Sequence, residues 1–241
     1  MERQRIFIDD ILSNENMNRA YKQVIKNKGA AGIDGMECND LLSHLKVNGH
    51  QLRESIRNQS YKPMPVKRVE IPKDNGSKRK LGIPTVTDRM IQQAAAQVLT
   101  PIYERKFHTN SYGFRPGKSA QQAVLKAAEY MNEGYNWVVD IDLEKFFDTV
   151  EHDKMISILN KEIKDGKTLS LIRKFLVSGV MVGEQMEETE IGTPNDAPTA
   201  QNHADLRGGV LRNVFRSGGL CAFTGGGTSC GENAGQYVLV L

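Results

Sequence analysis

Cysteine is scarce in this chain of 241 residues, which contains only Cys38, Cys221 and Cys230. Three thiols cannot all pair with one another, and their positions do not follow the short spacings of zinc ligands. The composition therefore excludes a disulfide-built secreted domain and a cysteine-rich metal site. A reducing compartment fits best, and we expect the protein to be cytoplasmic.

Long apolar runs are absent as well. The first residues, MERQRIFIDDIL, are charged and contain no apolar signal core. No segment approaches the roughly 18 consecutive apolar residues that a membrane-spanning helix needs. With 39% hydrophobic and 25% charged residues, the composition is that of a globular protein, so we expect a soluble chain without a membrane partner.

A large excess of one charge is also missing, since the net charge is only +3. The charge is unevenly distributed, however. The 19 residues from Lys62 to Lys80 contain seven basic side chains against Glu70 and Asp74, a local net charge of +5. This segment is either a polyanion-binding surface or the solvated face of a hairpin. Its basic residues are Lys62, Lys67, Arg68, Lys73, Lys78, Arg79 and Lys80.

Lysine disappears after Pro194. Residues 1–194 contain 18 lysines, whereas residues 195–241 contain none and hold 9 of the 22 glycines. The segment also lacks a sustained apolar period, so it cannot bury enough apolar surface to offset the entropy of ordering it. We expect this tail to be a flexible linker or the product of a shifted reading frame.

Periodicity before the tail predicts mixed helices and strands. The expected strands are 66–71 and 80–83, joined through Asn75-Gly76 as a hairpin, then 137–142, and a second hairpin formed by Val180, Val182 and the stretch Glu187–Ile191. The expected helical segments cover 15–28, 39–58 (as one helix or two), 88–98, 119–132, 151–163 and 168–177. Thr85 or Thr87 caps the third helix and Ser119 the fourth. In the second helix the inward positions are Leu41, Leu42, Leu45, Leu52 and Ile56.

The most informative segment is VVDIDLEKFFDTV, residues 138–150, in which an apolar strand ends in carboxylates and an aromatic turn. Carboxylates fixed at a sheet edge can hold the two Mg²⁺ ions of a phosphoryl-transfer site. By itself the pattern is weak evidence, because aspartate at a strand end is often a turn former or a helix cap. Asp148 fits a cap of the following helix. Phe147, five residues after Asp142, fits either core packing or a floor under a sugar.

Four segments, in order, resemble the reverse transcriptases of group II introns. The LGIPT…DR…Q and GFRPG pieces are specific to this group and its near relatives, and the resemblance covers about residues 5–194. It implies an α+β fold, a fingers–palm fragment of a right-hand polymerase, with helices around a short antiparallel palm sheet and a basic fingers β-hairpin. The segments are NKGAAGIDG (27–35), VKRVEIPKDNGSKRKLGIPTVTDRMIQQA (66–94), SYGFRPGKSAQQAV (111–124) and WVVDIDLEKFFDTVEHDKM (137–155).

The resemblance also assigns segments to parts of the polymerase. Residues 1–60 resemble the amino-terminal extension that contacts RNA, residues 61–134 the fingers and residues 135–194 part of the palm. The remaining residues, 195–241, form the atypical glycine-rich tail.

The resemblance implies a metal and nucleotide site. Asp142 looks like the first metal-binding aspartate of the palm, and Ile141 adds a backbone carbonyl to the same metal. Phe147 resembles the aromatic gate that contacts the sugar. Lys73 and Arg79 match the fingers residues that hold the incoming triphosphate, for which an ammonium and a forked guanidinium are suited.

Further residues follow from the same resemblance. Arg115 in GFRPG resembles a palm residue that braces the template or nucleotide site, although a structural arginine in a glycine turn is an equal alternative. The remaining ribbon cations are expected to bind RNA. The implied cofactor is Mg²⁺, and the implied partners are an RNA template or intron RNA, a DNA primer and dNTP. The RNA-binding candidates are Lys62, Lys67, Arg68, Lys78 and Lys80.

The resemblance fails after Pro194. The family continues there with Gln-Gly and later a Tyr-Ala-Asp-Asp hairpin that carries the other two metal carboxylates, whereas this chain has Asn195-Asp196 and no Tyr-Ala-Asp-Asp. We therefore expect that the chain belongs to a family of RNA-directed DNA polymerases but has no polymerase activity by itself. A non-catalytic RNA-binding module is the alternative from another class. A reverse transcriptase of a retron, a diversity-generating element or a CRISPR locus is a further alternative.

Overall fold

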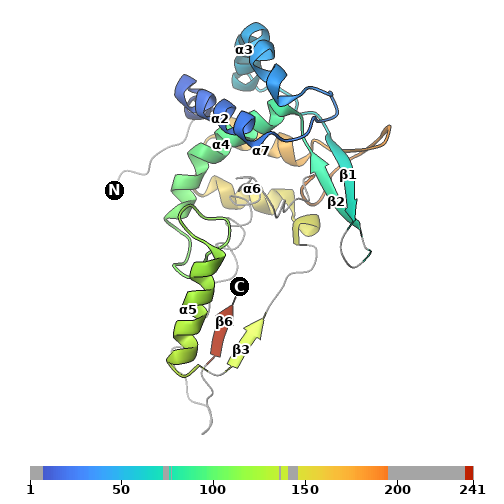
Figure 1. Cartoon of the computed structure of the whole chain (residues 1–241). Helices are drawn as coiled ribbons and strands as arrows, with labels where there is room; N and C mark the ends of the chain where they lie inside the picture. The colour runs from blue at the N-terminus through green and yellow to red at the C-terminus, as the bar shows by residue number, and fades with distance from the viewer. Residues whose placement is uncertain are drawn as a thin grey trace. The chain divides into compact units, whose positions relative to one another are not determined.

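The computed structural model describes residues 8–72, 76, 78–135, 137–140, 146–194 and 237–240. The chain divides into two compact units, one formed by Met1–Leu99 with Lys145–Arg207 and the other by Thr100–Glu144 with Gly208–Leu241 (Figure 1). This division cuts across the expected fingers and palm segments. None of the helices in the described parts of the chain combines the length and apolar character needed to cross a bilayer.

The helices that begin in the first unit lie close to the predicted ranges, except for the short helix Ile8–Leu12, which is not predicted from the sequence. The predicted range 88–98 is too short, because α4 continues through Pro101 to Glu104 and buries Tyr103 in its last turn. The helix bounds are α1 Ile8–Leu12, α2 Asn14–Asn27, α3 Leu41–Arg57, α4 Val86–Glu104, α6 His152–Asn160 and α7 Gly166–Leu176, with short 3₁₀ turns η1 at Cys38–Asp40 and η2 at Phe146–Thr149.

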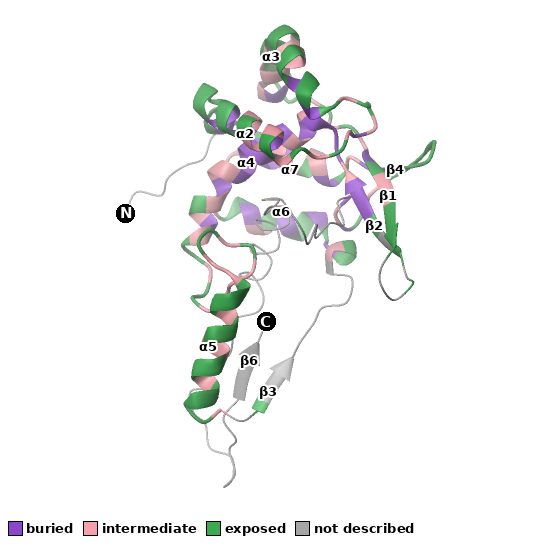
Figure 2. Ribbon diagram, in the orientation of Figure 1, coloured by how far each residue is buried: buried purple, intermediate pink, exposed green. Residues whose placement is uncertain are grey.

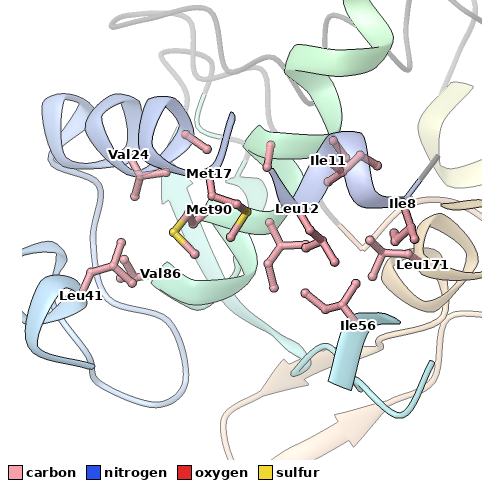
Figure 3. Close-up of a cluster of buried hydrophobic side chains, with 14 of the residues drawn as sticks. Ile8, Ile11, Leu12, Met17, Val24, Leu41, Ile56, Val86, Met90 and Leu171 are labelled. Atoms are coloured by element: carbon pink, nitrogen blue, oxygen red, sulfur yellow. The ribbon is translucent and has the colours of Figure 1, made fainter. Parts of the chain in front are cut away.

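The core of this unit lies between the first four helices and α7. Figure 3 shows Leu12, Met90 and Leu171 among the buried side chains that point toward one another. The predicted inward positions of α3 are confirmed for Leu41 and Ile56, while Leu45 and Leu52 are partly buried against the core. The prediction for Leu42 is wrong. Leu42 is 46% exposed. It lies one residue after the buried Leu41, so the turn of the helix points its side chain away from the buried face.

A buried asparagine joins α1, α2 and α4. The Asn16 side-chain amide donates to the carbonyls of Ile11 and Ala94, each at 2.9 Å. Gln97 in turn donates to the Asn16 side-chain oxygen at 2.8 Å. Because buried polar groups are costly unless they are paired, these bonds fix the amino-terminal helices on α4.

A four-stranded sheet with the order β2-β1-β4-β5 completes this unit. Strands β1 (Val66–Pro72) and β2 (Lys78–Ile83) form the predicted antiparallel hairpin, with Lys67 opposite Ile83 and Pro72 opposite Lys78. The second predicted hairpin is present and its first strand, β4 (Val180–Val182), is confirmed, but the predicted second strand is wrong, because β5 covers Gln185–Glu187 rather than Glu187–Ile191. The sheet as a whole is mixed rather than antiparallel, because β4 pairs in parallel with β1.

The second unit contains α5 (Ala120–Asn132) and two strands. Ser119 caps α5 as predicted, in a capping box with Gln122. Strand β3 (Trp137–Asp140) pairs in parallel with β6 (Tyr237–Val240), and Figure 1 shows the two side by side. The sequence predicts no regular structure after residue 194. The four described residues of the tail, Tyr-Val-Leu-Val, nevertheless form a strand because they are an apolar, β-prone run.

Candidate nucleic-acid and nucleotide site

The basic ribbon, defined as β1, β2 and the turn between them, is buried at its root and exposed toward its tip (Figure 2). Lys67 and Arg68 lie on β1, while Lys78 and Lys80 lie on β2, and the three lysines are exposed. Lys62, just before the ribbon, is exposed as well. Arg79 lies on β2 opposite Ile71, but Lys73 falls outside the described residues. Four of the five predicted RNA-binding residues are therefore exposed, whereas Arg68 is half-buried.

One acidic residue moderates the charge of the ribbon. The Lys78 ammonium lies 2.9 Å from a carboxylate oxygen of Glu70 on the facing strand. This hydrogen bond holds the pKa of Glu70 below its usual range and raises the pKa of Lys78. Both side chains remain open to solvent, so phosphate groups can compete for Lys78.

A buried carboxylate, Asp88, joins the two roots of the ribbon. Its oxygens accept from the Tyr61 hydroxyl at 2.6 Å and the Thr85 hydroxyl at 2.7 Å. The Met64 amide also donates to it, at 3.2 Å. Tyr61 and Met64 precede β1, whereas Thr85 follows β2, so one side chain holds both strands where they leave the helices. Thr85 also accepts from the Asp88 amide at 3.1 Å, which decides the cap of α4 in its favour over Thr87.

Asp88 is not among the predicted site residues, although it belongs to the LGIPT…DR…Q pattern. Its side chain is 1% exposed, so its charge is stabilised by three donors rather than by water. Burial, followed by the charge of Asp88, raises the pKa of Tyr61 well above its usual range. The phenol therefore stays protonated and donates.

Asp88→Asn should lower the free energy of unfolding by about 2 kcal/mol, because an amide group cannot accept from all three donors. Tyr61→Phe should cost about 1 kcal/mol, since it removes one bond and keeps the ring. Urea denaturation followed by circular dichroism measures both. Asp153→Asn is the matched control, because Asp153 is 82% exposed and its pair with Arg173 should contribute about 0.5 kcal/mol. Equal losses for Asp88→Asn and Asp153→Asn would contradict a joining role.

The turn that carries Phe147 is held by a distant segment. The Thr193 amide donates to the Phe147 carbonyl at 2.9 Å, and the Gly192 amide donates to the Val150 carbonyl at 2.8 Å. Phe147 is half-buried within η2. The prediction that Asp148 caps α6 is wrong, because the cap position is Glu151, which makes no side-chain capping bond.

The metal ligands expected from the resemblance, Ile141 and Asp142, lie outside the described residues. Among the residues that are described, histidine, cysteine and acidic side chains form no group of three or more that would suit a metal ion. The assignment of Mg²⁺ to Ile141 and Asp142 thus stays a prediction.

Arg115, in the second unit, is occupied by its own loop. Its guanidinium donates twice to one carboxylate oxygen of Glu104, at 3.0 and 2.6 Å. It also donates to the carbonyls of His108 and Ser111, at 2.7 and 2.9 Å, and lies over the Phe107 ring. The side chain is 7% exposed. This geometry favours the structural alternative over a contact with nucleotide.

Comparison with known proteins decides the family. Residues 71–198, more than half of the chain, match the family described as Reverse transcriptase (RNA-dependent DNA polymerase). The chain belongs to the reverse transcriptase family. The resemblance inferred from the four sequence segments, and the fold class that it implied, are therefore confirmed.

The relatives of this reverse transcriptase chain include proteins of group II introns. Group II intron-encoded protein LtrA of Lactococcus lactis subsp. cremoris is 38% identical over 177 residues, which cover 73% of this chain and 29% of LtrA. Protein YkfC of Escherichia coli is 35% identical over 175 residues, which cover 70% of this chain and 46% of YkfC. The chain thus spans less than half the length of either relative.

A solved structure shares the reverse transcriptase fold. The structure titled "Partial Cas6-RT-Cas1--Cas2 complex" superimposes with a TM-score of 0.52 over 83% of this chain and 33% of the other, at 23% identity. At that identity the similarity supports the fold alone.

Two of the segments that carry the reverse transcriptase resemblance pack directly on one another. A Cβ atom at Gly32 would lie 2.6 Å from the Thr85 Cα and 2.9 Å from the Pro84 carbonyl carbon. The neighbouring Gly29 carbonyl accepts from the Arg89 guanidinium at 3.4 Å. The NKGAAGIDG loop is therefore part of the wall that supports Thr85 and the root of the ribbon.

Proposed function

We propose that the chain is part of an RNA-directed DNA polymerase of the group II intron type. Its parent protein would copy RNA into DNA and aid the splicing and mobility of its intron. The observation that carries this proposal is the exposed basic ribbon, whose strand β2 and root residue Asp88 lie inside the segment that matches the reverse transcriptase family. The 38% identity to LtrA supports the intron assignment.

The ribbon would perform two tasks in this function. The exposed lysines on its strands would bind phosphates of an RNA template or of intron RNA, which gives affinity without sequence preference. Lys73 and Arg79 would hold the triphosphate of the incoming dNTP beside a DNA primer. Asp88 would keep both strands at a fixed angle to the helices during these contacts.

The palm residues would complete the site. Asp142 and the Ile141 carbonyl are the proposed ligands of Mg²⁺, and the metal supplies charge neutralisation and activation of the primer 3′-hydroxyl when bound. Phe147 would contact the sugar of the nucleotide. We also place the protein in the cytoplasm, in keeping with its few cysteines.

A second function, RNA binding without catalysis, is favoured by one observation. The 241 residues contain no Tyr-Ala-Asp-Asp, so the carboxylates that would share the metals with Asp142 are not in this sequence. The ribbon could still bind RNA in that case. Primer extension separates the two functions because only a polymerase lengthens the primer, whereas RNA binding is common to both.

The RNA-binding part of the proposal is tested by affinity for a structured intron RNA at several salt concentrations. The dissociation constant should rise steeply with salt, with a log–log slope of about 0.7 per phosphate contact to single strands. Lys62→Ala, Lys67→Ala and Lys80→Ala should each weaken binding and lower the slope by about 0.7, the value of one phosphate contact. Lys161→Ala is the control, because Lys161 is equally exposed but lies at the end of α6. A salt-independent affinity, or equal effects of all four variants, would count against the ribbon.

Glu70→Gln should strengthen RNA binding. The substitution removes the carboxylate that pairs with Lys78 and frees this ammonium for phosphate. We expect the affinity for RNA to rise by about fivefold at low salt. The log–log slope of affinity against salt should steepen by up to the value of one phosphate contact, about 0.7. Glu187→Gln, an equal charge change on the exposed end of β5, is the control. The same RNA titration measures both, and an unchanged affinity in Glu70→Gln would show that Lys78 does not contact RNA.

A further inference from the structure

Gly192 lies against the turn that carries Phe147 with no room for a side chain. Its φ is +84°, in the left-handed region that glycine tolerates best. A Cβ atom at this position would lie 2.8 Å from the Asp148 carbonyl oxygen and 2.9 Å from that of Phe147. Because both neighbours are backbone atoms, they can give way only if the whole turn moves.

Two backbone hydrogen bonds fasten the same turn at its two ends. The Thr193 amide binds the carbonyl of Phe147 within η2, and the Gly192 amide binds the carbonyl of Val150 just after it. The contact fixes the main chain of Phe147 rather than its ring. The position of the Cα atom, from which the ring extends, is thus set by residues more than 40 positions away in the sequence.

His152 also binds the segment that fastens the turn. Its Nε2 atom lies 2.6 Å from the Gly192 carbonyl oxygen, and the side chain is 6% exposed. A carbonyl oxygen only accepts, so Nε2 carries the proton in this bond. The peptide unit of Gly192 is therefore held between the turn and a buried imidazole that begins α6.

We propose that Gly192 and His152 are positioning residues for Phe147, and that they fix the distance between its ring and the sugar of an incoming nucleotide. The inference rests on the proposed function, in which Phe147 faces that sugar. A deoxyribose and a ribose differ by one hydroxyl, so an aromatic floor separates them only if it is held within about 0.5 Å. An aromatic on an unsupported 3₁₀ turn would not meet this requirement.

The position of Phe147 is measured in the 241-residue chain itself by fluorine NMR, with 4-fluorophenylalanine incorporated at residue 147. In Gly192→Ala the resonance should move by more than its linewidth or split, because the turn is displaced. Gly183→Ala is the matched control: Gly183 has a φ of +61° but nothing within 4 Å of its Cβ position, so the resonance should stay. The two variants share the backbone penalty and differ in the contact.

His152 is tested by a pair of substitutions that differ in one donor. His152→Leu leaves the buried Gly192 carbonyl unpaired and should move the resonance, whereas His152→Gln places an amide N–H near the same point and should restore it. This pair decides the matter if Gly192→Ala fails to fold. An unmoved resonance in folded Gly192→Ala, or equal spectra for His152→Leu and His152→Gln, would overturn the proposal. Loss of RNA binding by the unsubstituted chain would overturn the proposed function instead and leave the fluorine result intact.

Discussion

The purified 241-residue chain is expected to extend no DNA primer on an RNA template, with either Mg²⁺ or Mn²⁺. Two-metal transfer needs several carboxylates, because Mg²⁺ requires near-octahedral oxygen ligands. In the proposed site Asp142 would supply one carboxylate and the Ile141 carbonyl one neutral oxygen, while the sequence contains no Tyr-Ala-Asp-Asp to supply the others. It also contains no segment resembling the family's thumb, so the primer end would not be held in a reactive position. Each deficit should cost several orders of magnitude in rate.

The positive control for primer extension is a longer chain, in which residues 1–194 are followed by a Tyr-Ala-Asp-Asp hairpin and a thumb of the family type. Extension should appear only in that chain, and Asp142→Ala should abolish it there. Asp148→Ala is the control, because Asp148 lies in the same acidic segment, is exposed and has no proposed metal. Efficient extension by the 241-residue chain that disappears with Asp142→Ala would show that other residues of this chain supply the missing carboxylates.

Local signals account for most of what could be predicted from the sequence. The basic hairpin follows from two β-prone runs around Asn75-Gly76, and α5 begins where Ser119 and Gln122 form a capping box. Such features are encoded within a few residues, so no knowledge of the rest of the fold is needed. The tail strand β6 is not predicted, because four apolar residues are too short for a periodicity to emerge.

Long-range contacts explain what remained beyond prediction. Nothing local distinguishes Asp88 from a helix-capping aspartate, yet its partners Tyr61 and Met64 lie 27 and 24 residues away. The sequence leaves Arg115 open between a brace of the template or nucleotide site and a structural arginine, and only the positions of Glu104 and the loop carbonyls favour the structural alternative. The parallel pairing of β4 with β1 likewise depends on the assembled unit.

The candidate site shows the same division. The spacing of Phe147 from Asp142 makes Phe147 a candidate in the sequence, and the structure adds what supports it, the Gly192–Thr193 segment and His152. The sequence shows that residue 192 is glycine, but it does not show that a larger residue would not fit there. The reason, two carbonyl oxygens under 3 Å from a would-be Cβ, belongs to the three-dimensional fold.

Gly32→Ala tests this principle at the contact between two family segments, and it should destabilise the fold more than Asp88→Asn does. Its added methyl group would lie 2.6 Å from the Thr85 Cα and 2.7 Å from the Thr85 nitrogen. Thr85 is bound to Asp88 at the root of the ribbon, so the backbone there cannot retreat without breaking a buried hydrogen bond. Overpacking against a fixed backbone should cost about 3 kcal/mol.

Gly49→Ala is the control for Gly32→Ala, and we expect it to raise rather than lower the free energy of unfolding. Gly49 lies inside α3, and its nearest neighbour to a built Cβ is the Leu45 Cβ at 3.9 Å, an ordinary contact. Alanine should therefore stabilise the helix by about 1 kcal/mol through its smaller loss of backbone entropy. Urea denaturation of the two variants measures the difference, about 4 kcal/mol in total. Both substitutions add the same methyl group. A similar change in the free energy of unfolding of the two variants would therefore mean that the NKGAAGIDG loop does not pack on Thr85. RNA binding should also be measured for Gly32→Ala at urea concentrations below its unfolding transition, where the variant is still folded. Weaker binding there would show that this loop supports the ribbon through Thr85.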